Sequence, residues 1–512
     1  MSARGRASAL ALALILGACG GGGDVPRAPV VVPQPPPPPP PPRGAIVGSG
    51  PTVVPIGAGA AAVAKLEPAV FAALLENAQS GTTAITGTPK CAITTYSVKY
   101  NTVGAVGEAT TASAAIMVPS GAAPECSGAR PLLLYAHGTS VEKTYDMTNL
   151  AANTEARLVA AMFAAQGFIV VAPNYAGYAG SALPYHPYLD ANAQASDMVD
   201  ALRAARVGLG ATAATASSKL FISGYSQGGY VAVATQRAMQ IEYPGEFSPS
   251  ATAGMSGPYA LTQFGDAIFA GAPRLGVTAF LPLLINAGQR AGGALYASTS
   301  EVYEAQYASG IDTLLPSLLS IDDLVKGGKL PASALFARDS QPQGADAGAF
   351  FGDGNLVRSS YRSAYLADLQ AHPCGASAAD PLACAPQHAL RKHVLKNDLR
   401  NYVPATPLLL CGGDGDPTVP YLNTASMLAY LNARGMHGVA LTEVDLDSLP
   451  GVNDPYRTPK LSFASAKLAL RLAAIKNGDS PSTAVEVNYH AGLVAPFCMM
   501  AVRDYLRAKL TE

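Results

Sequence analysis

From about residue 91 onward, short apolar runs alternate with longer segments that have helical apolar spacing. The strand-like runs are CAITTYSVKYNT, TASAAIMVP, RPLLLYAHG, FIVVAPNYAG, KLFISGYS and ATAGMSGPY. The helix-like segments between them are EARLVAAMFAAQG, NAQASDMVDALRAARVGLG and QGGYVAVATQRAMQIE. The first two runs predict paired early strands, and the later runs, which lack polar alternation, indicate a parallel sheet covered on both faces. The sequence therefore predicts a doubly wound α/β class.

One serine lies at a junction between a predicted strand and a predicted helix. The strand KLFIS leads into the motif GYSQG, and a helix begins near Gln227, directly after Ser226. Gly224 and Gly228 remove side chains where the strand and the helix must pass closely. A strained strand-to-helix turn of this kind exposes a nucleophilic serine. The alternative interpretation of Ser226 is an ordinary helix-capping serine.

A serine hydroxyl needs a base, and the base is usually oriented by an acid. In chains with this type of turn the acid follows the serine, and the histidine comes last. In TPLLLCGGDGDPTVPYL, the strand Leu408 to Cys411 precedes a glycine-rich loop that carries Asp414 and Asp416. We favour Asp416, which opens DPTVP, with Asp414 as its rival. The alternative is a pair of turn aspartates.

His490 is the predicted base because it is the last of the seven histidines. It follows a short β-prone run, VEVNY, and precedes an expected C-terminal helix. A surface or core histidine is the alternative. The backbone N–H groups of Gln227 and Thr139 are the expected donors to a developing oxyanion. The other histidines lie before the position in the chain where the base is expected, or do not fit it. They are His137, at the oxyanion-loop position, and His186, His372, His388, His393 and His437.

Six segments together resemble the α/β-hydrolase superfamily: YAHGTS, APNYAGYAGS, GYSQGG, MSGPYAL, CGGDGDPTVP and NYHAG. More narrowly, they resemble bacterial lipase-like esterases related to the fungal secretory lipases, over roughly Thr88 to Glu512. The resemblance implies a mostly parallel sheet and ester hydrolysis through an acyl-enzyme. A mechanism of this kind needs no cofactor or metal, so none is expected. A serine peptidase of the same fold, or a non-catalytic binding module on a hydrolase scaffold, is the alternative.

Ser226 and Asp416 are separated by more chain than the core elements require. The excess, about 260–400, is predicted to be helical from VTAFLPLLINAGQRAGG, EVYEAQYASG and IDTLLPSLLSIDDLVKGG. We expect a largely helical cap, inserted after the sixth core strand, over the face where α/β sheets bind ligands. It could be a lid or a buried subdomain, so whether the ester substrate is a small molecule, a lipid or a polymer stays open. A second insertion is expected at about 450–483.

The N-terminus has the features of a targeting segment. Arg4 and Arg6 precede an apolar run, Ala9 to Leu16, that is too short to span a bilayer. LGAC then resembles the lipobox of bacterial lipoproteins, which implies a signal peptide over 1–18 and lipid attachment to Cys19. Gly20, and not an aspartate that would signal retention in the inner membrane, follows Cys19, so attachment to the outer membrane is expected. Which face of that membrane carries the protein is left open. A secretory signal with an incidental cysteine is the alternative. Residues 19–60, rich in glycine and proline, predict a disordered stalk, and 61–512 the hydrolase domain.

Charge and cysteine content narrow the picture further. The formal net charge is −1 and no basic stripe is present, which argues against a nucleic-acid partner. Six cysteines remain after Cys19, and an even number in an exported chain indicates bridges. Fifteen connectivities are possible, and local spacing suggests Cys91–Cys126, Cys374–Cys384 and Cys411–Cys498. No motif suggests zinc. We expect a monomer.

Overall fold

The computed structural model describes residues 41–57, 62–343, 348–375 and 377–511. These residues belong to one compact unit. The predicted signal peptide, Cys19 and residues 19–40 of the predicted stalk lie outside the described residues.

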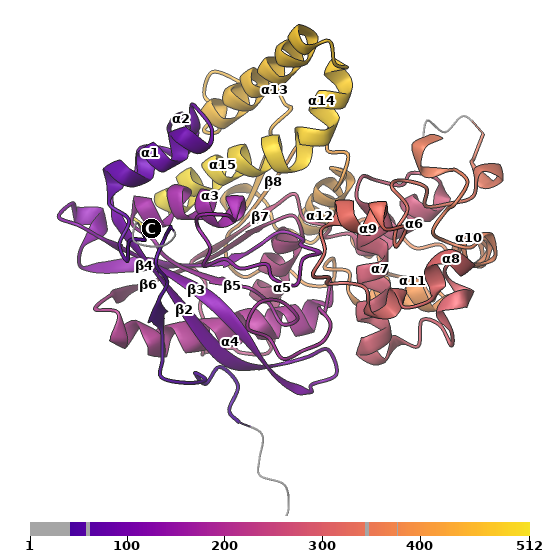
Figure 1. The fold of residues 1–512 in the computed structure, drawn as a ribbon, viewed down its shortest axis with the longest axis horizontal. Helices are drawn as coiled ribbons and strands as arrows, with labels where there is room; N and C mark the ends of the chain where they lie inside the picture. The colour runs from indigo at the N-terminus through magenta and orange to yellow at the C-terminus, as the bar shows by residue number, and fades with distance from the viewer. Residues whose placement is uncertain (1–40, 58–61, 344–347, 376, 512) are drawn as a thin grey trace, which may run out of the picture. The chain divides into compact units, whose positions relative to one another are not determined.

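A single nine-stranded sheet forms the centre of this unit, in the order β1-β2-β3-β5-β4-β6-β7-β8-β9 (Figure 1). The first three strands run antiparallel to their neighbours, and all pairings from β5 through β4 to β9 are parallel. The two early strands are paired over twelve residues, as the sequence predicts. The strands are β1 (Thr52–Val53), β2 (Ala92–Val103), β3 (Ala109–Ser120), β4 (Ala129–Ala136), β5 (Ile169–Pro173), β6 (Thr215–Tyr225), β7 (Ala251–Met255), β8 (Leu408–Gly412) and β9 (Leu441–Asp445).

Helices cover both faces of the sheet, so successive strand residues belong to different cores. On β3, Ala114 and Ile116 join the cluster that contains residues of α4, α5 and α12, whereas Ala115 and Met117 join the cluster of α3 and α15. The predicted doubly wound α/β class is confirmed. The helices are α1 (Pro68–Ala78), α2 (Thr82–Thr86), α3 (Thr154–Met162), α4 (Ala191–Gly208), α5 (Gln227–Ile241), α6 (Leu261–Ala270), α7 (Val277–Gly288), α8 (Ala305–Ala308), α9 (Ile321–Lys326), α10 (Ser359–Ala371), α11 (Ala389–Lys396), α12 (Leu422–Ala433), α13 (Arg457–Asn477), α14 (Pro481–Asn488) and α15 (Ala495–Ala508).

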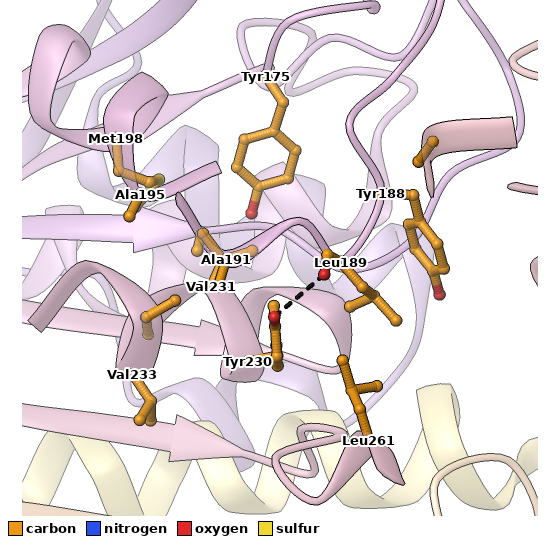
Figure 2. Packing of buried hydrophobic residues seen from close by; sticks show 14 of the residues in the cluster. Tyr175, Tyr188, Leu189, Ala191, Ala195, Met198, Tyr230, Val231, Val233 and Leu261 are labelled. Atoms are coloured by element: carbon orange, nitrogen blue, oxygen red, sulfur yellow. Dashed lines mark hydrogen bonds between the residues drawn. The ribbon is translucent and has the colours of Figure 1, made fainter. Parts of the chain in front are cut away.

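The hydroxyl of Tyr230 has hydrogen-bond partners inside this core. Figure 2 shows Tyr230 of α5 among apolar side chains, with its hydroxyl directed at the carbonyl of Leu189. The same hydroxyl also lies 2.7 Å from the carbonyl oxygen of Asn397, just after α11. A buried phenol hydroxyl needs such partners, because an unpaired one would be costly. This contact ties the helix after Ser226 to two loops that are distant in sequence.

The segment between β7 and β8 contains α6 to α11, which lie together to one side of the sheet (Figure 1). Its helices are shorter than the sequence predicts. The segment 301–328, expected to be helical over most of its length, contains only α8, α9 and two short 3₁₀ turns. Gly310, at φ 79°, and Pro316 interrupt the helical pattern there, because glycine favours turns and proline removes a backbone donor.

The second insertion forms the pair α13 and α14, near the top of Figure 1. The prediction of a β-prone run before His490 is wrong, because VEVN belongs to α14. Ser480 caps this helix by accepting a hydrogen bond from the Thr483 N–H, and Pro481 occupies its first turn. These two start signals outweigh the β propensity of the valines.

The predicted stalk boundary at residue 60 is also wrong. Arg43 forms an ion pair of 2.9 Å with the buried carboxylate of Asp200 in α4. Ile46 bridges to Tyr100, and β1 pairs with β2. Residues 43–57 therefore extend the sheet edge instead of forming a free linker, because β2 otherwise offers unpaired backbone groups.

Three disulfides link Cys91 to Cys126, Cys374 to Cys384 and Cys411 to Cys498. These are the pairings that local spacing suggests. The third joins β8 to α15 across 87 residues of sequence, so it closes a loop that includes β9 and the second insertion.

One helical run in the described part of the chain, Pro481–Ala508, is long and apolar enough to span a membrane by length and composition. It contains α14 and α15, and 61% of its most apolar window is buried inside the protein. That burial is typical of a core helix, and α15 packs against one face of the sheet.

Replacing both Cys411 and Cys498 with alanine should lower the free energy of unfolding by about 4 to 5 kcal/mol, because a long loop is released in the unfolded chain. Cys374 and Cys384 are only 10 residues apart, so their disulfide closes a much shorter loop. Replacing both of them with alanine should therefore lower the free energy of unfolding by only about 2 to 3 kcal/mol. Urea unfolding of the two variants under non-reducing conditions measures both. An equal loss in the two variants would contradict the loop argument.

Candidate active site

Ser226 lies in a sharp turn between β6 and α5. Its backbone has φ 58° and ψ −122°, a conformation that L residues rarely adopt. A Cβ on Gly224 would lie 2.2 Å from the carbonyl oxygen of Gly228, and one on Gly228 would lie 1.9 Å from that of Ala136. Both positions therefore require glycine, and their contact with the end of β4 holds the strained turn in place.

The three predicted side chains are brought into one hydrogen-bonded line. The Ser226 Oγ lies 2.8 Å from His490 Nε2, and His490 Nδ1 lies 2.6 Å from Asp416 Oδ2. Ser226 and Asp416 follow β6 and β8, and the carboxyl ends of these parallel strands share one edge of the sheet. A hydroxyl, an imidazole and a carboxylate in this order can activate the serine as a nucleophile.

Asp416, and not its rival Asp414, contacts the imidazole. Asp416 is buried, whereas Asp414 is exposed. Burial by itself would raise the pKa of the Asp416 carboxyl, but the charge and hydrogen bond of His490 and the donors around it hold that pKa below its usual value. The N–H groups of Thr418 and Val419 donate to its Oδ1 at 2.9 and 3.1 Å. The carboxylate therefore stays ionised beside the imidazole.

Ser256 adds a fourth side chain that the sequence reasoning did not assign. Its hydroxyl donates to Asp416 Oδ2 at 2.7 Å. Ser256 follows β7 and has a φ of 46°. The sequence feature that could have identified it is its place in the MSGPY segment, at the end of a predicted strand. Asp416 Oδ2 thus accepts from Ser256 and His490 together, which fixes the direction in which the carboxylate faces the ring.

His490 is held from its backbone as well. It lies in a π-helical turn, Tyr489–Val494, between α14 and α15. The Tyr225 hydroxyl donates to the His490 carbonyl oxygen at 2.5 Å, and the two rings lie 4.8 Å apart between centroids. A wide turn inside a helix changes the direction of a side chain, which is why such turns recur at functional sites.

The predicted oxyanion residues, Thr139 and Gln227, line the same cavity as Ser226. Gln227 is the first residue of α5, where a backbone N–H has no acceptor within the helix. Its side chain donates to His186 Nε2 at 2.7 Å, while His186 Nδ1 donates to the Ala176 carbonyl oxygen. Burial lowers the pKa of His186 to about 3, so this ring is neutral at pH 7 and able to accept.

Glu155 supports the loop that carries Thr139, and the sequence reasoning missed it. Its carboxylate accepts hydrogen bonds from the Gly138 N–H at 3.0 Å and from the hydroxyls of Tyr135 and Tyr145 at 2.9 Å each. Burial raises the pKa of Glu155, and these donors oppose that effect. Only the folded chain brings the four residues together, because they belong to β4, the following loop and α3.

An apolar cavity opens beside Ser226. The space measures about 800 Å³ when the open solvent at its mouth is included, and side chains of α6 and α7 form a large part of its wall. Leu261 is one of these side chains, and Tyr188 and Leu189 also line the cavity; all three are labelled in Figure 2. The described residues contain no cluster of histidine, cysteine or carboxylate side chains that could hold a metal ion. The cavity is suited to a hydrocarbon chain.

Replacing Ser256 with alanine should slow covalent labelling of Ser226 by an organophosphate about tenfold, because a hydrogen bond to a buried carboxylate is lost. Labelling is followed by mass spectrometry. Ser223→Ala is the matched control, since the buried Ser223 hydroxyl in β6 has no hydrogen-bond partner among the described residues, and its loss should change the rate less than twofold. Equal rates in both variants would contradict a role for Ser256 in orienting Asp416.

Comparisons with known proteins agree with this fold. Residues 154–242, from α3 through α5, match the model of the prolyl oligopeptidase family. No curated protein sequence is significantly similar to the chain. Two crystal structures of the rice cell wall degrading esterase LipA from Xanthomonas oryzae are similar to it. A mutant form has 25% identity and a TM-score of 0.67, covering 92% of this chain and 100% of that chain. The other has 26% identity and a TM-score of 0.63, covering 85% and 100%.

A protein from Legionella pneumophila, with 20% identity and a TM-score of 0.59, covers 78% of this chain and 91% of its own, which bears on the fold alone. The chain thus has the α/β-hydrolase fold, and over nearly its whole described length it is similar to an esterase of known structure.

Proposed function

We propose that the protein is a serine-dependent carboxylic ester hydrolase, with Ser226 as the nucleophile. The observation that carries the proposal is the line of hydrogen bonds from Ser226 through His490 to Asp416 at the mouth of an apolar cavity. Similarity to the LipA esterase gives it independent support.

The chemistry follows from the positions of the atoms. His490 Nε2 takes the proton of the Ser226 hydroxyl as its oxygen attacks the ester carbonyl carbon. Asp416 holds the ring by its Nδ1–H and stabilises the imidazolium cation. The N–H groups of Thr139 and Gln227 then donate to the tetrahedral oxyanion.

Collapse of that intermediate releases the alcohol, which receives the proton from His490, and leaves an acyl group on Ser226. Water, activated by the same imidazole, attacks the acyl-enzyme and releases the carboxylic acid. Every step uses groups of the chain itself, so the proposal invokes no metal or cofactor.

Two alternatives are less well supported. A serine peptidase of the same fold is suggested by the prolyl oligopeptidase match, but that match covers only the core around Ser226. It leaves out α6 and α7, which line the cavity, as well as Asp416 and His490. A non-catalytic binding module does not account for three side chains at hydrogen-bond distances. Comparison of nitrophenyl esters with the corresponding nitroanilides separates an esterase from a peptidase.

We also propose that the enzyme is tethered to the outer membrane through a lipid on Cys19. The support is the LGAC segment and the basic and apolar residues before it. A single lipidated cysteine next to a long proline-rich segment would hold the hydrolase domain near the membrane while leaving its cavity accessible.

Ser226→Ala and Asp416→Asn should each lower kcat for 4-nitrophenyl butyrate at least 10³-fold, because the first removes the nucleophile and the second disturbs the imidazole tautomer. Asp414→Asn is the matched control and should retain activity within about twofold, because Asp414 is exposed. Release of nitrophenolate measures all three. A Ser226→Ala variant as active as the parent would exclude this mechanism.

Replacing Cys19 with serine should release the protein from the membrane fraction of an expressing bacterium, because the lipid attachment site is lost. Fractionation and intact-mass measurement of the purified protein test this. Cys91→Ser should leave the mature protein in the membrane fraction. A mature chain that begins at Cys19 without a lipid mass would disprove the tether.

A further inference from the structure

One charged side chain interrupts the otherwise neutral wall of the cavity. Among the described residues that line it, Arg274 alone carries a charge. It lies in the connection between α6 and α7, two helices that form a large part of the apolar wall. Leu275, the next residue, also lines the cavity. Arg274 therefore lines the same cavity as Ser226.

Arg274 differs from the buried arginines of the same cap in having no direct ion-pair or hydrogen-bond partner, although the charge of Asp416 acts on it. Within residues 62–343, 348–375 and 377–511, its guanidinium makes neither an ion pair nor a hydrogen bond. By contrast, Arg391 pairs with Asp266 and Asp368, and Arg400 pairs with Asp398. Arg362, also buried, donates to the carbonyl oxygens of Phe269 and Ser340. The cap thus satisfies its other buried guanidiniums and leaves this one unpaired.

The unpaired state has a free-energy cost. Arg274 is partly buried, and this burial lowers the pKa of its guanidinium. A charge moved out of water is costly unless it gains a partner, which explains why partly buried arginines are usually paired. A cation left without a partner at the wall of an apolar cavity is therefore open to an anion that enters with the ligand.

Asp416, the acid whose charge acts on Arg274, is already engaged. Its carboxylate accepts hydrogen bonds from His490, Ser256 and two backbone N–H groups. The backbone next to Arg274 is fixed against the same loop, since the Leu275 N–H donates to the Pro417 carbonyl oxygen at 3.0 Å. Arg274 is consequently held near the reacting groups without being neutralised by them.

We propose that Arg274 binds a carboxylate carried on the acyl part of the substrate, so that the enzyme prefers monoesters of dicarboxylic acids to neutral esters of the same shape. The guanidinium presents parallel N–H donors that match the two oxygens of a carboxylate. The apolar walls contact the hydrocarbon between the two ends. This inference rests on the proposed ester hydrolysis and adds the substrate class.

The test compares two chromogenic esters of equal chain length: the mono-4-nitrophenyl ester of adipic acid and its neutral methyl ester. In Arg274→Met, the ratio of kcat/KM for the anionic ester to that for the neutral ester should fall about tenfold or more, because a charge-assisted contact is lost. Arg274→Glu should lower the ratio further. An effect of Arg274 on Asp416 alone would change both rates equally and would cancel in this ratio.

Arg290→Met is the matched control, because Arg290 is an exposed arginine of the same region outside the cavity wall, and the ratio should stay within twofold of the parent value. A ratio that is unchanged in Arg274→Met, with both rates still abolished by Ser226→Ala, would overturn the inference and leave the esterase proposal intact. Loss of the esterase proposal is seen instead as rates that do not depend on Ser226.

A binding measurement tests the inference without turnover. In the Ser226→Ala background, calorimetry with monomethyl adipate should show about tenfold weaker binding when Arg274 is also replaced by methionine. Dimethyl adipate should bind the two proteins equally. Equal binding of the monoanion by both proteins would overturn the inference, and circular dichroism of each variant shows that the fold is retained.

Discussion

The close backbone contact between the turn at Ser226 and the end of β4 is the constraint on which the rest of the site depends. Gly224 and Gly228 let the turn approach Ala136 so closely that any side chain would overlap a carbonyl oxygen. Ser226 keeps its strained φ of 58° because packing on both sides of the sheet leaves the turn no other conformation. The hydroxyl consequently lies at the sheet edge where the loops after β4, β7 and β8 also begin.

Two buried carboxylates hold the groups around Ser226 in fixed positions. Asp416 and Glu155 are both buried, and each accepts hydrogen bonds from several neighbouring donors. In a medium of low dielectric constant, such fully satisfied groups are rigid and strongly oriented. Asp416 thereby directs the imidazole, and Glu155 fixes the loop that presents Thr139. Arg274 shows the opposite condition, a charge for which the protein itself supplies no partner.

Sequence patterns worked best where a single element carries the information. The core strands have continuous apolar runs. The turn at Ser226 is recognisable from its two glycines and from the change in the spacing of apolar residues from strand to helix. They failed where local start or stop signals were overlooked, or where a tertiary contact outweighs local propensity. VEVN is helical because Ser480 and Pro481 start a helix, the helices of 301–328 are interrupted at Gly310 and Pro316, and residues 43–57 pair with the sheet edge.

The order of elements, the chemistry available in Ser226, Asp416 and His490, and the basic and apolar residues that suggest export at the N-terminus are read from the sequence alone, because periodicity and spacing are local. The choice between Asp414 and Asp416, the hydrogen bonds of Ser256 and Glu155, and the unpaired state of Arg274 were decided by the tertiary structure. Each depends on distance and burial between residues far apart in the chain, and neither quantity is encoded in a pattern of neighbouring residues.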